Sequence, residues 1–234
     1  RGGFDSEPRE WVDLGFSEPT LANAYFLITG SGAYMHNVSA SPIENIGIVE
    51  MNEAGSAYRV VWGLMNRKPT SELPTHIMNH AIRMKATDGA CRVIYHAHPN
   101  NIIAMTFVEP LDARTFSRAL WKAMTECVVV FPEGVGVVPW MVPGGNEIAK
   151  ATSEQMKSYP AVIWAQHGLF VSGADFDETF GLMHCIEKAA DIYFRARTMN
   201  GGSNEFLNTI TDEGLAQIGV EFNVEINKEF LDVQ

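Results

Sequence analysis

The spacing of hydrophobic and polar positions divides the chain into short strands and longer helices. Apolar or alternating runs of a few residues, bounded by turn-forming residues, predict strands. These strands span residues 25–29, 46–51, 57–63, 92–98, 127–131, 161–165 and 168–172. Residues 52–55 supply turn-forming side chains between the second and third strands, so these two strands should form a hairpin.

Apolar residues at helical spacing predict helices in the intervening segments. The first helix follows Thr70 and Ser71, whose side chains are favoured at helix N-termini, and it should end near residues 88–89. The other helices span residues 101–108, 113–124, 146–157 and 175–198, with Gly201 placed to stop the last one. Hairpins mixed with helices predict an α/β fold: a single α/β/α layered domain over residues 1–234, with a central, mostly antiparallel or mixed sheet.

The composition is that of an ordinary globular protein. The 234 residues are 46% hydrophobic and 19% charged, and no repeat or low-complexity tract marks a linker. The formal net charge of −11 argues against an extended surface for nucleic acid. No apolar run approaches the ~20 residues of a membrane helix and no signal peptide is visible, so we expect no membrane partner.

The cysteines indicate a reducing compartment. Cys91, Cys127 and Cys185 are odd in number and have no short pairing along the chain. Each lies in an apolar or mixed segment, where a cysteine is usually a buried free thiol. We therefore expect three buried free thiols and a cytoplasmic location.

His96 and His98 end the predicted strand at residues 92–98. Residues i and i+2 of a strand point to the same face, so the two imidazoles can reach one metal ion. His167 follows another apolar strand and stands directly before Gly168, which would let a neighbouring backbone approach closely. Three imidazole ligands leave one position open, as in a catalytic zinc site. The alternative is that each is an ordinary core histidine with a satisfied hydrogen bond.

A second pair of histidines competes for the role of metal ligand. His76 and His80 share one face of the helix that follows Ser71. Ile77 stands where a metalloprotease motif needs a glutamate, so a solvated or interface face is the alternative interpretation.

Two segments have the features of a phosphate-binding loop. Gly30 and Ser31 follow a strand, and flexible backbone there lets N–H groups converge on an anion, although an ordinary turn is the alternative. Thr70 and Ser71 open a helix, whose N–H groups and dipole favour an anion, although plain N-capping also explains them. Glu72 stands beside this helix start and could abstract a proton from a substrate whose phosphate is bound there.

Taken together, the motifs resemble the zinc-dependent class II aldolases of sugar phosphates. The segments that carry the resemblance are residues 28–32, 69–74, 96–98, 125–127, 131–134, 139–144, 166–168 and 177–181. They occur in the family's order with similar spacing and cover nearly the whole chain, from about Tyr25 to Arg197. Within the family, the likeness is greatest to the members that act on L-rhamnulose 1-phosphate.

The resemblance implies a reversible aldol cleavage in rhamnose catabolism. L-rhamnulose 1-phosphate would give dihydroxyacetone phosphate and L-lactaldehyde. The resemblance also implies one Zn²⁺ ion per subunit, bound by His96, His98 and His167. Glu72 would be the catalytic acid–base group and would also occupy a metal position when substrate is absent.

Further residues acquire roles through the same resemblance. Gly30, Ser31, Thr70 and Ser71 would bind the phosphate group of a small phosphorylated sugar. Glu126 matches a catalytic carboxylate at the aldehyde end, which would reach in from a neighbouring subunit. The family implies a cyclic homotetramer with its sites at the subunit interfaces.

The N-terminal segment departs from the family pattern. Family members carry a helix followed by a loop rich in glycine and asparagine that contacts phosphate and substrate. Gly2 and Gly3 match a remnant of that loop and are further phosphate-binding candidates, but the expected asparagine is absent. We therefore expect the helix and part of the loop to be missing from the given residues. The alternative is that this protein lacks part of the phosphate-binding loop.

Other functions remain open. Cleavage of fuculose 1-phosphate or epimerisation of a pentulose phosphate would use the same histidines and loops. A non-catalytic adducin-like interaction domain has the same fold, but three histidines together with Glu72 argue against it. A zinc hydrolase would use Glu72 to activate a water molecule, and the phosphate-like loops are less expected there.

Overall fold

The computed structural model describes residues 8–65 and 67–232, which form two compact units. The first unit contains the described residues up to Ala81 together with Val142–Lys150. The second contains Ile82–Met141 and the described residues from Ala151 onward. The single domain expected for residues 1–234 stays a prediction.

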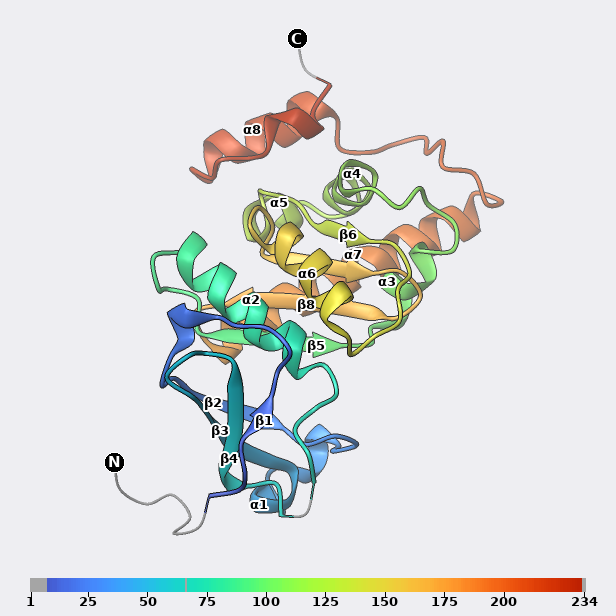
Figure 1. Cartoon of the computed structure of the whole chain (residues 1–234). Coiled ribbons are helices and arrows are strands. Elements are labelled where there is room, and N and C mark those ends of the chain that lie inside the picture. Colours follow the sequence, from blue (N-terminus) through green and yellow to red (C-terminus); the bar gives the residue numbers. More distant parts are fainter. Residues whose placement is uncertain (1–7, 66, 233–234) are drawn as a thin grey trace. The chain divides into compact units, whose positions relative to one another are not determined.

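Antiparallel strands form the sheet of the first unit (Figure 1). In the order of their pairing, they are β1 (Val12–Asp13), β4 (Ala57–Gly63), β3 (Ile46–Met51) and β2 (Tyr25–Thr29). The predicted bounds of β2, β3 and β4 are confirmed, and β3 and β4 form the expected hairpin. The Oδ1 atom of Asn52 closes its turn by accepting from the backbone N–H of Ser56 at 2.8 Å.

Short elements and one long helix complete the first unit. A small core of Val49, Val60 and Leu64 packs against partly buried side chains of the same sheet. The short elements are α1 (Pro42–Asn45) and the 3₁₀ turns at Pro19–Leu21 and Met35–Asn37. Helix α2 (Leu73–Ala86) begins in the first unit, as predicted after Thr70 and Ser71, and ends in the second.

The second unit contains a mixed sheet. In the order of their pairing, its strands are β5 (Val93–Ala97), β8 (Gly168–Gly173), β7 (Ala161–Trp164) and β6 (Gly136–Val138). Strands β6 and β7 are parallel, and the other pairs are antiparallel. Every residue of β7 and β8 is buried, as expected where both faces of a sheet are covered. The α/β class and the mostly antiparallel or mixed pairing are confirmed, with the strands divided between two sheets.

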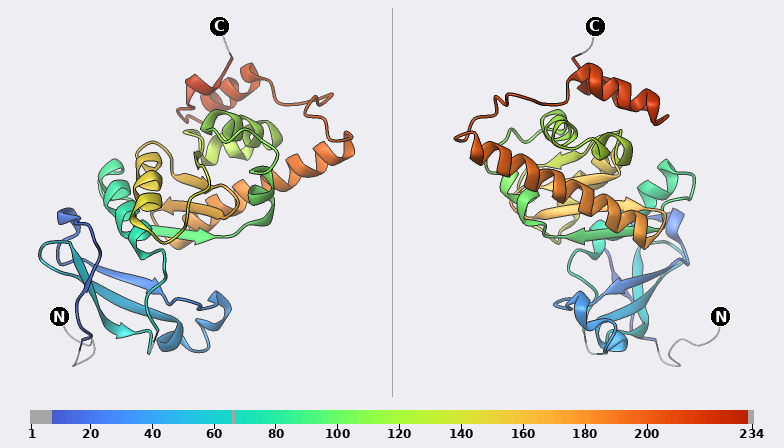
Figure 2. Two further views of the ribbon diagram at one scale, coloured as in Figure 1. Left: turned by 45° about the vertical axis from the view of Figure 1, so that its right-hand side comes forward. Right: turned by 180° about the vertical axis from the view of Figure 1, so that it is seen from behind.

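Helices of the second unit pack against this sheet and against one another. They are α3 (Asn100–Met105), α4 (Ala113–Ala123), α5 (Glu126–Val130), α7 (Phe176–Met199) and α8 (Asp212–Glu221), followed by a 3₁₀ turn at Lys228–Phe230. Helix α7 crosses one face of the sheet, as the view from behind in Figure 2 shows, and contacts β5, β8, α3, α4 and α5. Asp175 caps its start by accepting from the N–H of Glu178, and Gly201, with φ +64°, follows its end as predicted.

Helix α6 (Asn146–Met156) begins in the first unit and ends in the second. In the second unit, Thr152 holds α6 to β7 because its hydroxyl oxygen accepts from the indole N–H of Trp164 at 2.7 Å. Both side chains are buried, so this bond satisfies polar groups that would otherwise be costly to remove from water.

The prediction of a strand at residues 127–131 is wrong. The segment is helix α5, and the N–H of Phe131 donates to the carbonyl of Cys127 at 3.0 Å. A short, fully apolar run has no periodicity that separates a buried strand from a buried helix. Because α5 contacts α7 and α8, tertiary packing outweighs the strand preference of its valines. Strand β6 and helix α8 were not expected from the sequence.

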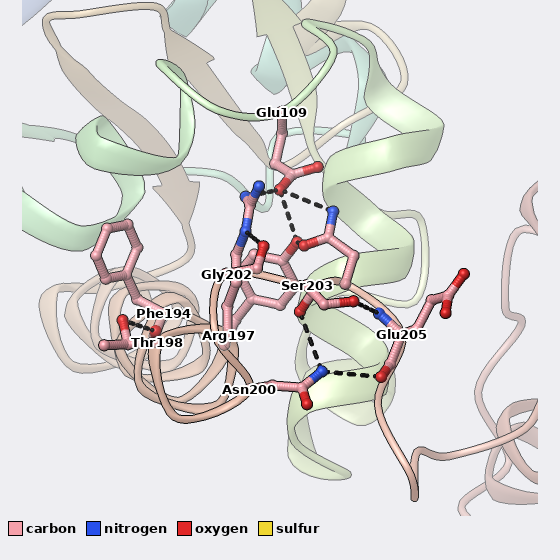
Figure 3. Close-up of polar contacts among 10 residues, drawn as sticks. Glu109, Phe194, Arg197, Thr198, Asn200, Gly202, Ser203 and Glu205 are labelled. Atoms are coloured by element: carbon pink, nitrogen blue, oxygen red, sulfur yellow. Dashed lines mark hydrogen bonds and ion pairs between the residues drawn. The ribbon is translucent and has the colours of Figure 1, made fainter.

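A polar network fixes the C-terminal end of α7 (Figure 3). The largely buried carboxylate of Glu109 accepts from the hydroxyl of Tyr193 at 2.6 Å and from Nη1 of Arg197 at 2.5 Å. Burial and the bond to Glu109 raise the pKa of Tyr193. Nε of Arg197 donates to the carbonyl of Gly202 at 3.0 Å, which ties the loop after α7 to the same network. Each charge is therefore paired, as a buried carboxylate requires.

The cysteines are free thiols, in agreement with the sequence. Cys91 and Cys127 are buried, whereas Cys185 is half-buried rather than buried. The sulfur atoms of Cys127 and Cys185 lie 3.9 Å apart. Within the described part of the chain, no helix has the length and apolar character needed to cross a membrane.

Candidate metal centre

Strand pairing in the second unit brings three histidines together. His96 lies in β5 and pairs with Phe170 of β8. His98 follows the end of β5, and His167 lies in the turn between β7 and β8, directly before Gly168. Because β8 is hydrogen-bonded to both β5 and β7, the turn that carries His167 lies beside the end of β5.

The three histidines can share one metal ion. Each offers a ring nitrogen, and these atoms lie within 4.8 Å of one another. The ring centroids are 5.0 Å apart for His96 and His98, 5.3 Å for His96 and His167, and 5.1 Å for His98 and His167. Zinc–imidazole bonds are about 2.0–2.1 Å long, so one ion bound between the rings would draw the three nitrogens closer together. Among the described residues, this is the one group of metal-binding side chains at such distances.

Neighbouring groups fix the orientation of His96. Its Nδ1 lies 3.1 Å from the carbonyl oxygen of Leu169, which can only accept, so Nδ1 carries the proton. Nε2 then has the lone pair that a metal ion requires. The ring of His96 stacks on Phe170 with centroids 4.0 Å apart, and Trp164 lies 5.6 Å from it and 5.0 Å from His167. These aromatic rings restrict the rotation of both imidazoles.

Gly168 leaves the room that the histidine rings occupy. A Cβ atom at this position would lie 2.5 Å from the carbonyl oxygen of Ala97, 2.9 Å from Cε1 of His96 and 3.0 Å from Cδ2 of His98. Such distances are too short for non-bonded contact with carbon. Any side chain here would displace the end of β5 or the rings, so the expected close approach of backbone at Gly168 is confirmed.

In the first unit, backbone pairing places the two predicted anion-binding segments side by side. An isolated antiparallel bridge joins Gly30 to the segment before Thr70. The N–H of Thr70 donates to the carbonyl of Thr29, and the N–H of Ser31 donates to the carbonyl of Lys68, each at 2.9 Å. The Ser31 side chain is exposed and that of Thr70 is half-buried, so hydroxyl groups of both segments can reach a ligand.

Two residues that were not expected from the sequence border these segments. Nη1 of Arg67 donates to the carbonyl of Ser31 at 3.2 Å, which places a positive charge beside the loop. Gly144, with φ +84°, lies against Ser71, because a Cβ atom on Gly144 would be 3.2 Å from the Ser71 carbonyl oxygen. The sequence did contain a signal for Arg67. Arg67 and Lys68 stand just before Thr70 and Ser71, and positively charged side chains attract a bound anion.

Glu72 and the competing histidines occupy different surroundings in the first unit. Glu72 is half-buried immediately before α2, and its backbone N–H donates to Oγ1 of Thr70 at 3.4 Å. His76 is buried, and the ring of His80 lies 5.0 Å from that of Phe26. The competing pair is thus held by packing within the first unit, whereas His96, His98 and His167 converge.

The structure assigns no role to the other candidates. Glu126 is exposed at the first residue of α5 in the second unit, and its catalytic role stays a prediction. Gly2 and Gly3 lie outside the described residues.

The family of the chain follows from its relatives. Residues 9–194 match the class II aldolase and adducin N-terminal domain, and the chain belongs to this family. The aldolases of the family are metal-dependent, and His96, His98 and His167 form a group that could bind the metal. The resemblance inferred from the sequence is therefore confirmed.

Individual members of the family show which aldolases this chain is similar to. Rhamnulose-1-phosphate aldolase of Shigella sonnei is 45% identical over 224 residues, which cover 95% of this chain and 80% of that protein. A solved sugar-phosphate aldolase from Thermotoga maritima has a TM-score of 0.72 at 30% identity, covering 85% of this chain and 82% of that one. A solved L-fuculose 1-phosphate aldolase shares the fold, with a TM-score of 0.57 at 24% identity and coverage of 85% and 80%.

Proposed function

We propose that this chain is a lyase that reversibly cleaves L-rhamnulose 1-phosphate to dihydroxyacetone phosphate and L-lactaldehyde, as a step of rhamnose catabolism. The observation that carries the proposal is the convergence of His96, His98 and His167, for which a non-catalytic adducin-like interaction domain has no use. The identity of 45% to a rhamnulose-1-phosphate aldolase over 95% of this chain supports the substrate.

We propose zinc as the ion, one per subunit, bound by the three imidazoles. Neutral imidazoles suit zinc and leave its full positive charge in place. The bound ion would supply a Lewis acid for the negative oxygen that carbon–carbon cleavage leaves on the substrate. The Nδ1–H bond of His96 to Leu169 contributes by holding the ring in the tautomer that binds metal.

Glu72 is proposed as the acid–base group. In the condensation direction its carboxylate would remove a proton from the hydroxyl-bearing carbon of dihydroxyacetone phosphate. In the cleavage direction it would return a proton to the same carbon. The hydrogen bond from its N–H to Oγ1 of Thr70 sets the backbone of Glu72 beside the residues proposed to bind the phosphate.

The phosphate would be bound by Gly30, Ser31, Thr70 and Ser71, with Arg67 adding a positive charge. The pairing of the two segments supports this role, because it sets the hydroxyls of Ser31 and Thr70 on neighbouring backbones. Binding the phosphate away from the reacting carbons orients the substrate and lowers the entropic part of the barrier.

The assembly and location are also proposals. We propose a cyclic homotetramer in which Glu126 acts at the aldehyde end of a neighbouring subunit's substrate. The exposure of Glu126 at the start of α5 supports such a role, because an exposed carboxylate can reach another molecule. The free thiols support a reducing, cytoplasmic environment.

An aldol-cleavage assay tests the proposal directly. Purified protein would be incubated with L-rhamnulose 1-phosphate or L-fuculose 1-phosphate, and release of dihydroxyacetone phosphate would be followed with and without a chelator. We expect faster cleavage of the rhamnulose ester, abolished by the chelator and restored by Zn²⁺. Faster cleavage of the fuculose ester, or epimerisation of a pentulose phosphate, would reassign the substrate. No reaction with any sugar phosphate would favour the interaction domain.

Replacing Glu72 with alanine separates the acid–base role from metal binding. We expect Glu72→Ala to keep its zinc and its fold but to lose roughly 10²–10⁴-fold in turnover, the usual scale of a general base. Glu53→Ala, in the turn between β3 and β4 of the same unit, is the control and should turn over normally. Near-normal turnover of Glu72→Ala would remove this carboxylate from the mechanism.

A further inference from the structure

Helix α3 joins the two parts of the chain that carry His98 and His167. The helix spans Asn100–Met105 and begins just after His98 and Pro99. Its C-terminal cap is Thr106, which contacts the turn that carries His167. Pro99, at the N-terminal cap position, makes no side-chain capping bond, so the helix start depends on a partner from elsewhere in the fold.

That partner is Glu187 of α7. One carboxylate oxygen accepts from the backbone N–H and the side-chain amide of Asn101, at 3.0 and 2.8 Å. The other oxygen accepts from the backbone N–H of Ile102 at 3.0 Å. A charged acceptor for two helix N-terminal N–H groups also matches the helix dipole, so Glu187 clamps the first turn of α3 to α7.

The other end of the helix is bonded to the turn between β7 and β8. The hydroxyl of Thr106 donates to the carbonyl of Ile103 at 2.6 Å and accepts from the backbone N–H of Gln166 at 3.0 Å. The side-chain amide of Gln166 donates to the Thr106 carbonyl at 2.9 Å. Gln166 has φ +56°, a left-handed conformation that a residue with a side chain adopts only when its surroundings hold it there.

We propose that α3 is a strut that sets the separation of His98 and His167, and that Glu187 and Thr106 are positioning residues for a divalent metal ion. Glu187 fixes the first turn of α3, shortly after His98, and Thr106 fixes the residue directly before His167. Neither side chain is a metal ligand in this assignment. This role rests on the proposed metal binding by the histidines. It adds Glu187 and Thr106 as residues that set how tightly the ion is bound.

The physical reason is preorganisation. Two ligands on separate loops bind an ion weakly if each must be ordered on binding, because that ordering opposes the binding free energy. Some hydrogen bonds orient metal ligands without contacting the ion themselves. Their removal typically lowers metal affinity by about 10–100-fold. Thr106 is only 4% exposed, so water does not readily replace its hydroxyl as the acceptor for Gln166.

Metal titration of the full chain tests the proposal without substrate. Metal-free wild type, Glu187→Gln and Thr106→Val would be titrated with Zn²⁺ in competition with a chromogenic chelator. Glutamine keeps the shape of Glu187 but has one acceptor oxygen, so its NH₂ group would face a donor N–H. Valine keeps the shape of Thr106 but removes the hydroxyl. We expect each variant to bind Zn²⁺ at least about 10-fold more weakly than wild type.

Matched substitutions provide the controls. Glu178→Gln changes an exposed carboxylate near the start of α7, which accepts from the N–H of Ala174 at 3.3 Å. Thr198→Val removes an exposed hydroxyl near the end of the same helix, which donates to the carbonyl of Phe194 at 2.8 Å (Figure 3). Both should bind Zn²⁺ as wild type does. Thermal unfolding of all metal-free proteins separates a loss of affinity from a loss of folded protein.

A second measurement reports the geometry of the metal ligands rather than the stability of the protein. Co²⁺ in place of Zn²⁺ gives visible absorption bands that depend on ligand geometry, and these should change in both variants but in neither control. Wild-type affinity and spectra in both variants would overturn the positioning role while leaving the proposed function intact. A wild-type chain that binds no divalent ion would overturn the metal site and the strut together. If Glu187→Gln does not fold, the Zn²⁺ affinity and Co²⁺ spectrum of Thr106→Val still test the positioning role.

Discussion

Individual residues around the histidines act mainly through the space and the hydrogen bonds they provide. His96 is held by a carbonyl on one ring nitrogen and by the face of Phe170, so little rotational freedom remains to be lost when an ion binds. Gly168 contributes by having no side chain, because backbone and two imidazoles occupy the space where a Cβ atom would lie. At this scale, one methyl group is enough to disturb the site.

Gly168→Ala should therefore impair metal binding. The added carbon would lie 2.5 Å from the Ala97 carbonyl oxygen, so the end of β5 and the His96 ring must shift. We expect at least about 10-fold weaker Zn²⁺ binding, measured by chelator competition. Gly181→Ala is the control, because within the described part of the chain no heavy atom beyond its chain neighbours and the backbone of its own helical turns lies within 4 Å of its new Cβ in α7. That variant should bind metal normally, and equal affinity of both variants would contradict the steric role of Gly168.

Secondary-structure elements of the second unit are joined by buried charges as well as by apolar contact. Asp212, at the start of α8, pairs with Lys122 and Arg118 of α4 at 2.8 and 3.0 Å and accepts from the N–H of Asp232 at 2.9 Å. Burial of Asp212 raises its pKa, but these three bonds together outweigh it and lower the pKa to about 2. The ion pairs thus hold α8 to α4 while Asp212 is charged.

The link between α8 and α4 should weaken in acid. Because the pKa of Asp212 is lower in the folded chain than in the unfolded chain, its contribution to the free energy of unfolding is complete above about pH 4. The contribution is lost as the pH falls from about 4 to about 2. We expect Asp212→Asn to be less stable than wild type at neutral pH, with the difference shrinking over this range.

Denaturant unfolding at several pH values measures this difference. Asp191→Asn, which removes an exposed pair with Arg195 on the surface of α7, is the control and should change stability little at any pH. A stability difference between wild type and Asp212→Asn that stays constant from neutral pH to about pH 2 would show that the charge of Asp212 is not responsible.

At the scale of the whole molecule, metal binding and folding are linked. All three histidines of the candidate centre belong to the second unit, and they come from separate points of the chain that meet only through strand pairing. The unfolded chain lacks this arrangement, so an ion bound by the histidines stabilises the folded state. A ligand at 100 times its dissociation constant adds about 2.7 kcal/mol to the free energy of unfolding.

Metal removal should therefore lower the thermal stability of the wild-type chain. We expect Zn²⁺ to raise the unfolding temperature of the metal-free protein and a chelator to reverse the rise. His98→Ala should show no such shift, because two ring nitrogens bind the ion much more weakly than three. His36→Ala, in the 3₁₀ turn Met35–Asn37 of the first unit, should behave as wild type. A shift in His98→Ala equal to that of wild type would place the ion elsewhere.

The sequence by itself determined the elements that depend on local pattern and turn chemistry. The bounds of β2, β3 and β4 follow from short apolar or alternating runs and from the turn residues at 52–55, and α7 follows from helical spacing with Gly201 as its stop. It also determined which residue types could bind metal, because two histidines at i and i+2 of a strand share a face.

Only the tertiary structure decided the features that depend on non-local contacts. It made the predicted strand at residues 127–131 part of helix α5 and its C-terminal cap, since packing against α7 and α8 outweighs a local pattern that suits either structure. It divided the strands between two sheets and brought His167 to His96 and His98. Local periodicity records which face of an element is buried, but not which distant partner buries it. The clamp of Glu187 on α3, between residues far apart in the chain, is visible for the same reason only in the folded molecule.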